Sequence, residues 1–246
     1  GQIVLFKGKH AVKVRLWGWK FHGRIIRDIY AVGAPSILMQ SIASIMQFGM
    51  NIILGTMTET AVAVMGVYGR LQSFIFMPVF GLNQGVLPIM GFNFGARNRK
   101  RLMETYKKGF LIAFIIMAAG LVIFQMFPRQ LLAMFNSQNN QAMFDIGIPA
   151  LRYISLCFLP AAFGIMTSSI FQATAHGFLS LWGSLIRQLV GILPLAWILA
   201  AIGGVDLVWF AFPLAELLGT VYFAIALKHL YRTEIRRLDI LAETSY

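Results

Sequence analysis

The side chains with the clearest chemical potential are a few charged residues inside otherwise apolar stretches. Glu216 has apolar neighbours on both sides, and Arg70 and Arg187 lie in similar surroundings. Charged side chains are costly in hydrocarbon, so each needs a partner or a wet cavity. A carboxylate in such a place can carry a proton or a cation, or it can lock two helices together as a structural partner of an arginine.

Arg70 and Glu216 are predicted to lie at the same depth. Each is about nine residues from the outer end of its apolar stretch, which is roughly 14 Å at 1.5 Å per residue. Equal depth predicts an Arg70–Glu216 ion pair. Arg187 lies nearer the opposite surface, where it either extends its head group to water or reaches Glu216 across roughly 9 Å of depth. Extension to water is the commoner of the two outcomes.

Amide side chains form a second group of candidates. Gln40, Gln47 and Asn51 are spaced seven and four residues apart, which places them on one face of a helix. Such a stripe can hydrogen-bond a passing substrate or a neighbouring helix, and the spacing allows both. The full set of candidate pathway residues is Gln40, Gln47, Asn51, Arg70, Asn83, Gln84, Gln172, Arg187, Gln188 and Glu216.

The elements that must position these residues are membrane-spanning helices. Hydrophobic residues make up 58% of the 246 residues and charged residues 12%, against about 25% charged in soluble domains. Each apolar stretch reaches the roughly 20 residues needed to cross a bilayer. The fold class predicted is an all-α, six-helix transmembrane bundle, with spans at 30–54, 61–90, 106–127, 146–174, 181–202 and 207–227.

The basic residues predict the orientation of these spans. Of the 21 Lys and Arg, seven precede the first span, six lie between or just inside the second and third, and four follow the sixth. All three groups fall on one side if every span crosses, and only Arg129 lies clearly in a loop on the other side. The excess of Lys and Arg in cytoplasmic segments places both ends in the cytoplasm. We expect a multi-pass protein of the plasma membrane, and no nucleic-acid partner.

Proline and glycine interrupt the spans repeatedly. Prolines fall within or at the edge of five spans, among them Pro35, Pro78, Pro88, Pro160, Pro194 and Pro213. Proline removes a backbone hydrogen bond and kinks a helix. Irregular backbone at membrane depth survives only where it is buried in protein or lines a wet cavity, and transporters build substrate sites at such breaks.

The predicted organisation has three parts. Residues 1–28 are basic and aromatic and are expected to form a cytoplasmic connector on the membrane surface, with a lipid-sensing amphipathic segment as the alternative. Residues 29–231 form the six-helix lobe, and 232–246 a cytoplasmic tail. The stretch 129–145 is expected to be an outer loop with a short amphipathic piece at 131–135. Because the chain begins with Gly, we expect it to be part of a longer protein.

The sequence also excludes several chemistries. It contains no Walker-type phosphate loop, no metal-ligand cluster and no Ser-His-Asp candidate, so we do not expect an enzyme. A single cysteine rules out an internal disulfide. Without an ATP site, active transport would draw its energy from an ion gradient or from another subunit, and no cofactor other than Na⁺ or H⁺ as coupling ion is expected.

Several motifs resemble one family of membrane transporters. The block Pro78–Ile89, followed by Gly91–Ala96 and a basic run, is similar to the second half of multidrug and toxic compound extrusion (MATE) transporters. Gly33–Ser36, Leu185–Gln188 with Pro194, and Trp209–Glu216 are weaker matches. The resemblance covers residues 28–231.

The resemblance implies one lobe of a twelve-helix transporter, the C-terminal one, which works with an N-terminal six-helix half. It implies export of amphipathic or cationic compounds in exchange for Na⁺ or H⁺ by alternating access. Some members carry a carboxylate midway along the helix that begins with the Gly-x-Pro motif, where this chain has only amides. The alternatives are a flippase for lipid-linked oligosaccharides, which should have a larger and strongly basic cavity, and a non-transporting membrane scaffold, which should have none.

Overall fold

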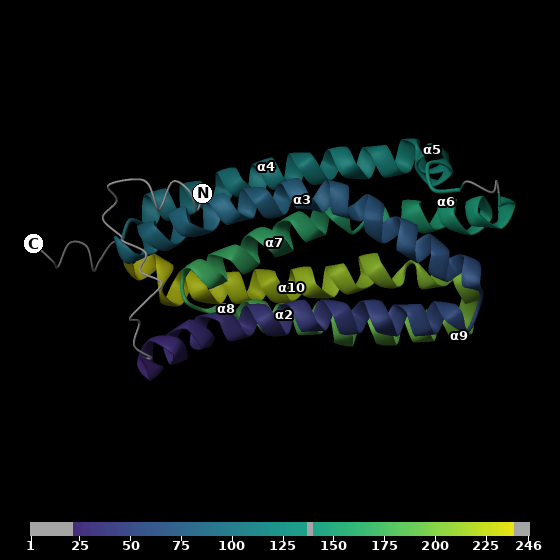
Figure 1. Ribbon diagram of the computed structural model, residues 1–246. Coiled ribbons are helices and arrows are strands. Elements are labelled where there is room, and N and C mark those ends of the chain that lie inside the picture. Colours follow the sequence, from purple (N-terminus) through teal and green to yellow (C-terminus); the bar gives the residue numbers. More distant parts are fainter. Residues whose placement is uncertain (1–21, 137–139, 239–246) are drawn as a thin grey trace, which may run out of the picture. The chain divides into compact units, whose positions relative to one another are not determined.

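A computed structural model describes residues 22–136 and 140–238, and all the regular structure among them is helical (Figure 1). The helices are α2 (Gly23–Gly55), α3 (Glu59–Gly95), α4 (Arg99–Met126), α5 (Pro128–Ala133), α6 (Gln141–Ser155), α7 (Phe158–Ala173), α8 (Gly177–Leu185), α9 (Leu193–Val208) and α10 (Ala211–Thr233). A π-helix, η1 (Ile186–Ile192), joins α8 to α9, and a short 3₁₀ turn, η2 (Ile235–Arg237), follows α10.

Up to six of these elements are long and apolar enough to cross a membrane. Five single spans are found, and α6 and α7 form the sixth as a pair bent by 46°. Each predicted span falls on one of these elements. The predicted outer segment between the third and fourth spans contains the short helix α5 and the start of α6.

The chain divides into two compact units between Ala34 and Pro35. Helix α2 continues across this boundary, and the second unit holds the remaining helices. Residues 1–21 of the predicted connector (1–28) and residues 239–246 of the predicted tail (232–246) lie outside the described residues. The three-part division of the chain therefore stays a prediction.

The spans break where the sequence weakens them. Pro160 and Pro213 lie in the first turn of a helix that follows a break, where the missing N–H has no intrahelical partner in any case. Pro194 lies where the π-helix η1 runs directly into α9. Pro78 and Pro88 lie inside α3. A further break within α9 comes at Gly203 and Gly204, whose backbone angles are not helical. The bends are therefore built from prolines, glycines and one π-helix.

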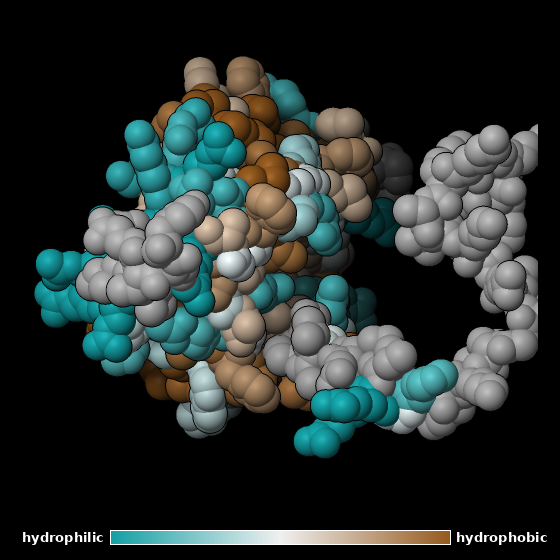
Figure 2. Space-filling model, turned by 90° about the vertical axis from the view of Figure 1, so that its left-hand side faces the viewer, coloured by the Kyte–Doolittle hydropathy of each residue, from teal (hydrophilic) through white to brown (hydrophobic). Residues whose placement is uncertain are grey.

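Apolar side chains cover the bundle both inside and out. The core contains large buried residues such as Trp209, Tyr68 and Phe158, whereas Leu111, Phe74 and many others are exposed, as lipid-facing or partner-facing side chains would be. Figure 2 looks at the end of the bundle where α3 meets α4, and hydrophilic side chains gather over part of this end with hydrophobic ones around them. The distribution is that of a membrane-embedded bundle with a polar end.

Two turns between helices use the same backbone device. Arg97, after α3, and Ala175, after α7, have positive φ angles of 55° and 63°. At the second turn the His176 N–H donates to the Phe171 carbonyl at 2.7 Å and the Ala175 N–H to the Gln172 carbonyl at 3.1 Å. This is the hydrogen-bond pattern of a Schellman motif, whose left-handed residue is usually glycine.

Ala175→Gly is therefore expected to raise the stability of the chain by about 1 kcal/mol, because alanine is strained in the left-handed region. Ala119→Gly, at an exposed position inside α4, is the matched control and should lower stability by roughly 0.5–1 kcal/mol. Thermal unfolding of the purified chain in detergent checks both. A similar loss of stability in the two variants would contradict the strain at Ala175.

Candidate functional site

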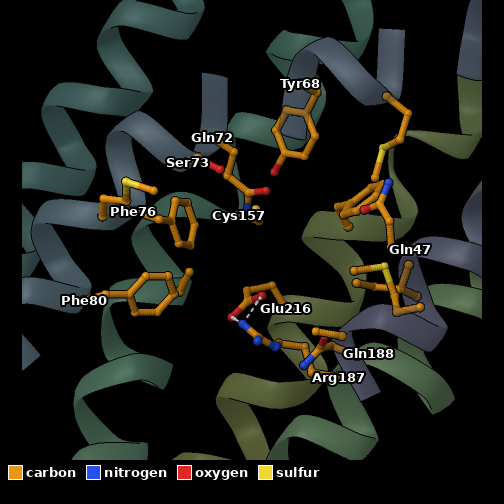
Figure 3. A pocket seen from close by; sticks show the side chains of 17 residues that line it. Gln47, Tyr68, Gln72, Ser73, Phe76, Phe80, Cys157, Arg187, Gln188 and Glu216 are labelled. Carbon is orange, nitrogen blue, oxygen red and sulfur yellow. Dashed lines mark hydrogen bonds and ion pairs between the residues drawn. The ribbon is translucent and has the colours of Figure 1, made fainter. Parts of the chain in front are cut away.

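Two hollows penetrate the described part of the bundle next to each other. The first, the Glu216 hollow, has a volume of about 400 Å³ and is lined by α2, α3, η1 and α10 together with Cys157 and Ala161 (Figure 3). The second, the amide hollow, has a volume of about 380 Å³ and is lined by α2, α3, α7 and η1 with single residues of α8 and α10. Both hollows are lined by Ala43, Phe80, Arg187 and Gln188, so these residues separate one hollow from the other.

A buried ion pair lies at this boundary. One terminal nitrogen of Arg187, Nη1, donates to both carboxylate oxygens of Glu216, at 3.1 Å to Oε1 and 3.2 Å to Oε2. The Glu216 side chain is 7% exposed and that of Arg187 is 24% exposed. The carboxylate is therefore almost completely removed from solvent, whereas the guanidinium keeps access to the hollows. A buried pair of this kind is costly to separate, because either charge alone would be left uncompensated.

The π-helix η1 supplies the arginine. Pro194 has no N–H, so the carbonyl four residues earlier cannot receive its usual helical hydrogen bond. The wider π turns lie immediately before this proline and carry Arg187 and Gln188. A π turn inserts an extra residue into the helix and turns the residues around it, and such turns occur frequently at functional sites. In this π-helix, the Arg187 side chain points towards Glu216 of α10 (Figure 3).

Glycines bring the elements around the pair into close contact. A Cβ at Gly191 in η1 would lie 2.8 Å from the Ala215 Cβ of α10, and one at Gly219 would lie 3.3 Å from the Arg187 Cβ. A Cβ at Gly164 in α7 would lie 3.5 Å from Oε1 of Glu216. The small residues therefore let η1, α7 and α10 close around the two charged side chains.

The rest of the Glu216 hollow combines apolar and hydrogen-bonding groups. Phe76, Phe80 and Phe212 contribute aromatic rings, and Gln47, Gln72, Ser73 and Gln188 contribute polar groups. Tyr68 points its hydroxyl into the hollow (Figure 3). That hydroxyl is buried and has no hydrogen-bond partner among the described residues. The hollow therefore offers one carboxylate, one guanidinium, several amides and a broad aromatic wall.

Most of the predicted pathway residues lie in these two hollows. Gln47 and Glu216 line the Glu216 hollow, Arg187 and Gln188 line both, and the amide hollow takes Gln40, Asn83, Gln84 and Gln172. Asn83 is also hydrogen-bonded to Ser169 of α7. Asn51 and Arg70 line neither hollow and are exposed in the described residues.

The partner of Glu216 differs from the sequence prediction. The equal depth of Arg70 and Glu216 predicted a pair between them, but Glu216 binds Arg187. Depth locates a residue along a helix and says nothing about its direction. On α3, Tyr68 and Gln72 face the Glu216 hollow. Arg70 is two residues from each of them, and two residues turn a helix by about 200°, so the Arg70 side chain points away from this hollow. Of the two outcomes left open for Arg187, the less common one holds, since its side chain reaches Glu216.

Sequence reasoning missed several lining residues. Tyr68, Gln72, Ser73 and Cys157 in the Glu216 hollow, and Ser168 and Ser184 in the amide hollow, are uncharged and easily taken for packing residues. A signal existed on α3, where Tyr68, Gln72, Phe76 and Phe80 recur every four residues. That spacing places one aromatic and polar face along the helix.

A bundle of broken apolar spans with charged and amide side chains turned inward defines a multi-pass membrane protein with a polar interior. The MatE family model matches residues 35–198, more than half of the chain. The chain belongs to the MatE family, as the sequence motifs predicted.

Individual relatives agree with this assignment. The chain is 23% identical over 214 residues to the multidrug export protein MepA of Staphylococcus aureus (strain bovine RF122 / ET3-1), which covers 87% of this chain and 47% of that protein. It is similar to a crystal structure of MATE in complex with MaL6, with a TM-score of 0.85, 28% identity, and coverage of 97% of this chain and 53% of that one.

A third comparison shows that the fold also occurs in a transporter with a different proposed role. The chain matches a MOP superfamily transporter from Pyrococcus furiosus with a TM-score of 0.84 and 27% identity, over 97% of this chain and 53% of that one. The reverse polarity of the binding pocket in that transporter is described as suggesting a different function. The chain spans about half the length of the relatives it matches. Their structures contain a second region of similar size.

Proposed function

We propose that this chain is the C-terminal lobe of a secondary active multidrug efflux transporter. It exports amphipathic or cationic compounds in exchange for Na⁺ or H⁺ by alternating access. Membership of the MatE family and the similarity to a multidrug export protein support this function. The chain covers 47% of that relative, which supports a second six-helix lobe as its partner.

The observation that carries this proposal is the lining of the Glu216 hollow. A single carboxylate lies beside the aromatic rings of Tyr68, Phe76 and Phe80 and the thioethers of Met46 and Met77. Aromatic faces attract cations, flexible thioethers adapt to apolar groups of different shape, and a carboxylate binds positive charge. A lipophilic cation satisfies all three, whereas a single rigid substrate does not require such an adaptable surface.

The ion pair supplies a mechanism for exchange. Arg187 holds both oxygens of Glu216, so a substrate cation or a coupling cation can bind this carboxylate only by competing with the guanidinium. The two hollows on either side of Arg187 give the released head group space to move. A ligand shifts a conformational equilibrium only through a difference in its affinity for the two states. Competition for Glu216 provides such a difference, since the pair is intact in one state and separated in the other.

The two alternatives fit the hollows less well. A flippase for lipid-linked oligosaccharides should line its cavity with many basic groups. Among the residues that the structure describes, Arg187 is the one cation lining either hollow, and it is already paired. A scaffold should pack its polar residues tightly, whereas two hollows of about 400 and 380 Å³ accompany them here. The basic end of the bundle supports a plasma-membrane protein with both ends in the cytoplasm.

Transport by the Glu216→Gln variant tests this function. The assay uses membrane vesicles that contain the chain together with its partner lobe, a fluorescent lipophilic cation as substrate, and Na⁺ and H⁺ gradients imposed separately. We expect efflux to fall at least about tenfold, or ~1.4 kcal/mol, because the variant removes the carboxylate for which the substrate cation and the coupling cation compete. Asp206→Asn, at an exposed acid outside both hollows, should transport normally.

Two outcomes would contradict this function. If neither gradient drives efflux in the wild-type vesicles, the lobe does not belong to an antiporter. If the Glu216→Gln and Asp206→Asn variants both transport at the wild-type rate, Glu216 has no part in the mechanism.

A further inference from the structure

We propose that a groove at the polar end of the bundle binds the phosphate of an anionic phospholipid. This basic groove has a volume of about 630 Å³ and lies between the start of α4 and the end of α10. It is lined by Arg99, Lys100, Met103, Glu104, Lys107, Lys108 and Tyr231. Four basic side chains thus face one acid, at the end of the bundle where the second and third spans are predicted to reach the membrane surface.

The acid in the groove is already neutralised. Glu104 accepts an ion pair from Lys108 at 2.7 Å, one helical turn along α4. Lys100 and Lys107 form no ion pair with any residue that the structure describes, so their charges are available to a ligand. Phosphate is the anionic group that head groups of lipids present to such a site, and basic pockets between membrane helices are suited to bind it.

One wall of the groove is held in place by α10. Nη2 of Arg99 donates a hydrogen bond to the Tyr231 hydroxyl at 3.0 Å, and the guanidinium carbon lies 5.6 Å from the centre of the Tyr231 ring. The ring and the hydrogen bond together fix the direction of the guanidinium. The groove therefore combines one oriented planar cation with the exposed lysines Lys100 and Lys107.

The same face of α4 continues as an apolar surface. Lys100, Lys107, Leu111 and Ile115 share this face at ~100° per residue. Leu111 is 57% exposed and Ile115 is 59% exposed. Basic groups at the membrane surface followed by exposed apolar groups at greater depth match the two parts of a phospholipid, its head group and its acyl chains. A free phosphate ion would use only the first part, so the occupant we propose is a lipid.

Native mass spectrometry of the purified full chain in detergent tests this site. Phosphatidylglycerol and phosphatidylcholine with identical acyl chains are offered at equal concentration, and we expect phosphatidylglycerol to be retained preferentially. The Lys100→Gln, Lys107→Gln double variant should bind it at least roughly tenfold more weakly, because hydrogen bonds to charged groups are lost. The matched control, Arg236→Gln with Arg237→Gln, removes two exposed charges outside the groove and should bind normally.

Three results would overturn the proposal. The two double variants could lose the lipid equally, which would show that only net positive charge matters. Phosphatidylcholine could bind as tightly as phosphatidylglycerol. Inorganic phosphate at the same concentration as the lipid could displace it, which would show that the acyl chains contribute nothing and that the ligand is free phosphate.

The Tyr231→Phe variant, which keeps the ring and removes the hydroxyl that orients Arg99, should weaken phosphatidylglycerol binding by a smaller factor than the double lysine variant.

Discussion

Arg187→Gln is expected to lower the stability of the chain by about 3–5 kcal/mol, because it leaves the Glu216 carboxylate buried without its partner. Glu216→Gln should lower the stability by less. The Arg187 side chain that it leaves behind is 24% exposed and can turn towards a hollow, whereas the Glu216 side chain is 7% exposed. We therefore expect the Glu216→Gln variant to lose transport and remain folded. Thermal unfolding of both single variants in detergent measures the difference.

The double variant Arg187→Gln, Glu216→Gln completes the cycle. It should recover most of the stability lost by Arg187→Gln, because neither charge remains unpaired and the two amides can hydrogen-bond each other. If the costs of the two single substitutions simply add in the double variant, the two side chains do not act as a pair in the folded protein.

Gly191→Val is the second substitution with a large expected effect. A Cβ at this position would lie 2.8 Å from the Ala215 Cβ, 3.0 Å from the Ile186 carbonyl oxygen and 3.2 Å from the Ala215 Cα. Two of these atoms belong to the backbone, so η1 and α10 must move apart rather than a side chain rotate. We expect a loss of about 3 kcal/mol or more, at the upper end of the cost of overpacking. Transport should also be lost, because Arg187 moves with η1.

The control for this substitution is Gly66→Ala on α3, where an added Cβ would meet nothing within 4 Å. Stability by thermal unfolding and efflux of the lipophilic cation are measured for both variants. If Gly191→Val unfolds and transports like Gly66→Ala, the close packing of η1 on α10 is not needed for either stability or function.

The sequence alone predicted the class of fold and most of the membrane crossings. Apolar length, Gly and Pro interruptions and the placement of Lys and Arg carry this information, because the bilayer imposes them on any spanning helix. They also located the outer segment between the third and fourth spans. What they do not contain is the direction in which each helix turns its faces, which is decided by packing between helices.

The ion pair illustrates this limit. Glu216 was singled out because it is a charged residue within an apolar stretch, but its partner was chosen from depth alone. Arg187 reaches Glu216 through η1. A π-helix has no reliable pattern of its own in a sequence. Pro194 and Gly191 after Arg187 are compatible with one and with an ordinary kinked α-helix as well. The uncharged residues Tyr68 and Gln72 were missed because charge, rather than the spacing of one face of α3, guided the search.

The Glu216 hollow should be filled with water and should receive the substrate, and cysteine accessibility at Gln72 measures both properties. The only native cysteine is first replaced by Cys157→Ser, and Gln72→Cys or Val122→Cys is then introduced. Val122 is exposed on α4 and is absent from the lining of either hollow, so it serves as the lipid-facing control. We expect a small water-soluble thiol reagent to label position 72 but not 122, and the lipophilic cation to slow labelling at 72. No labelling at 72, or labelling that the cation does not change, would contradict it.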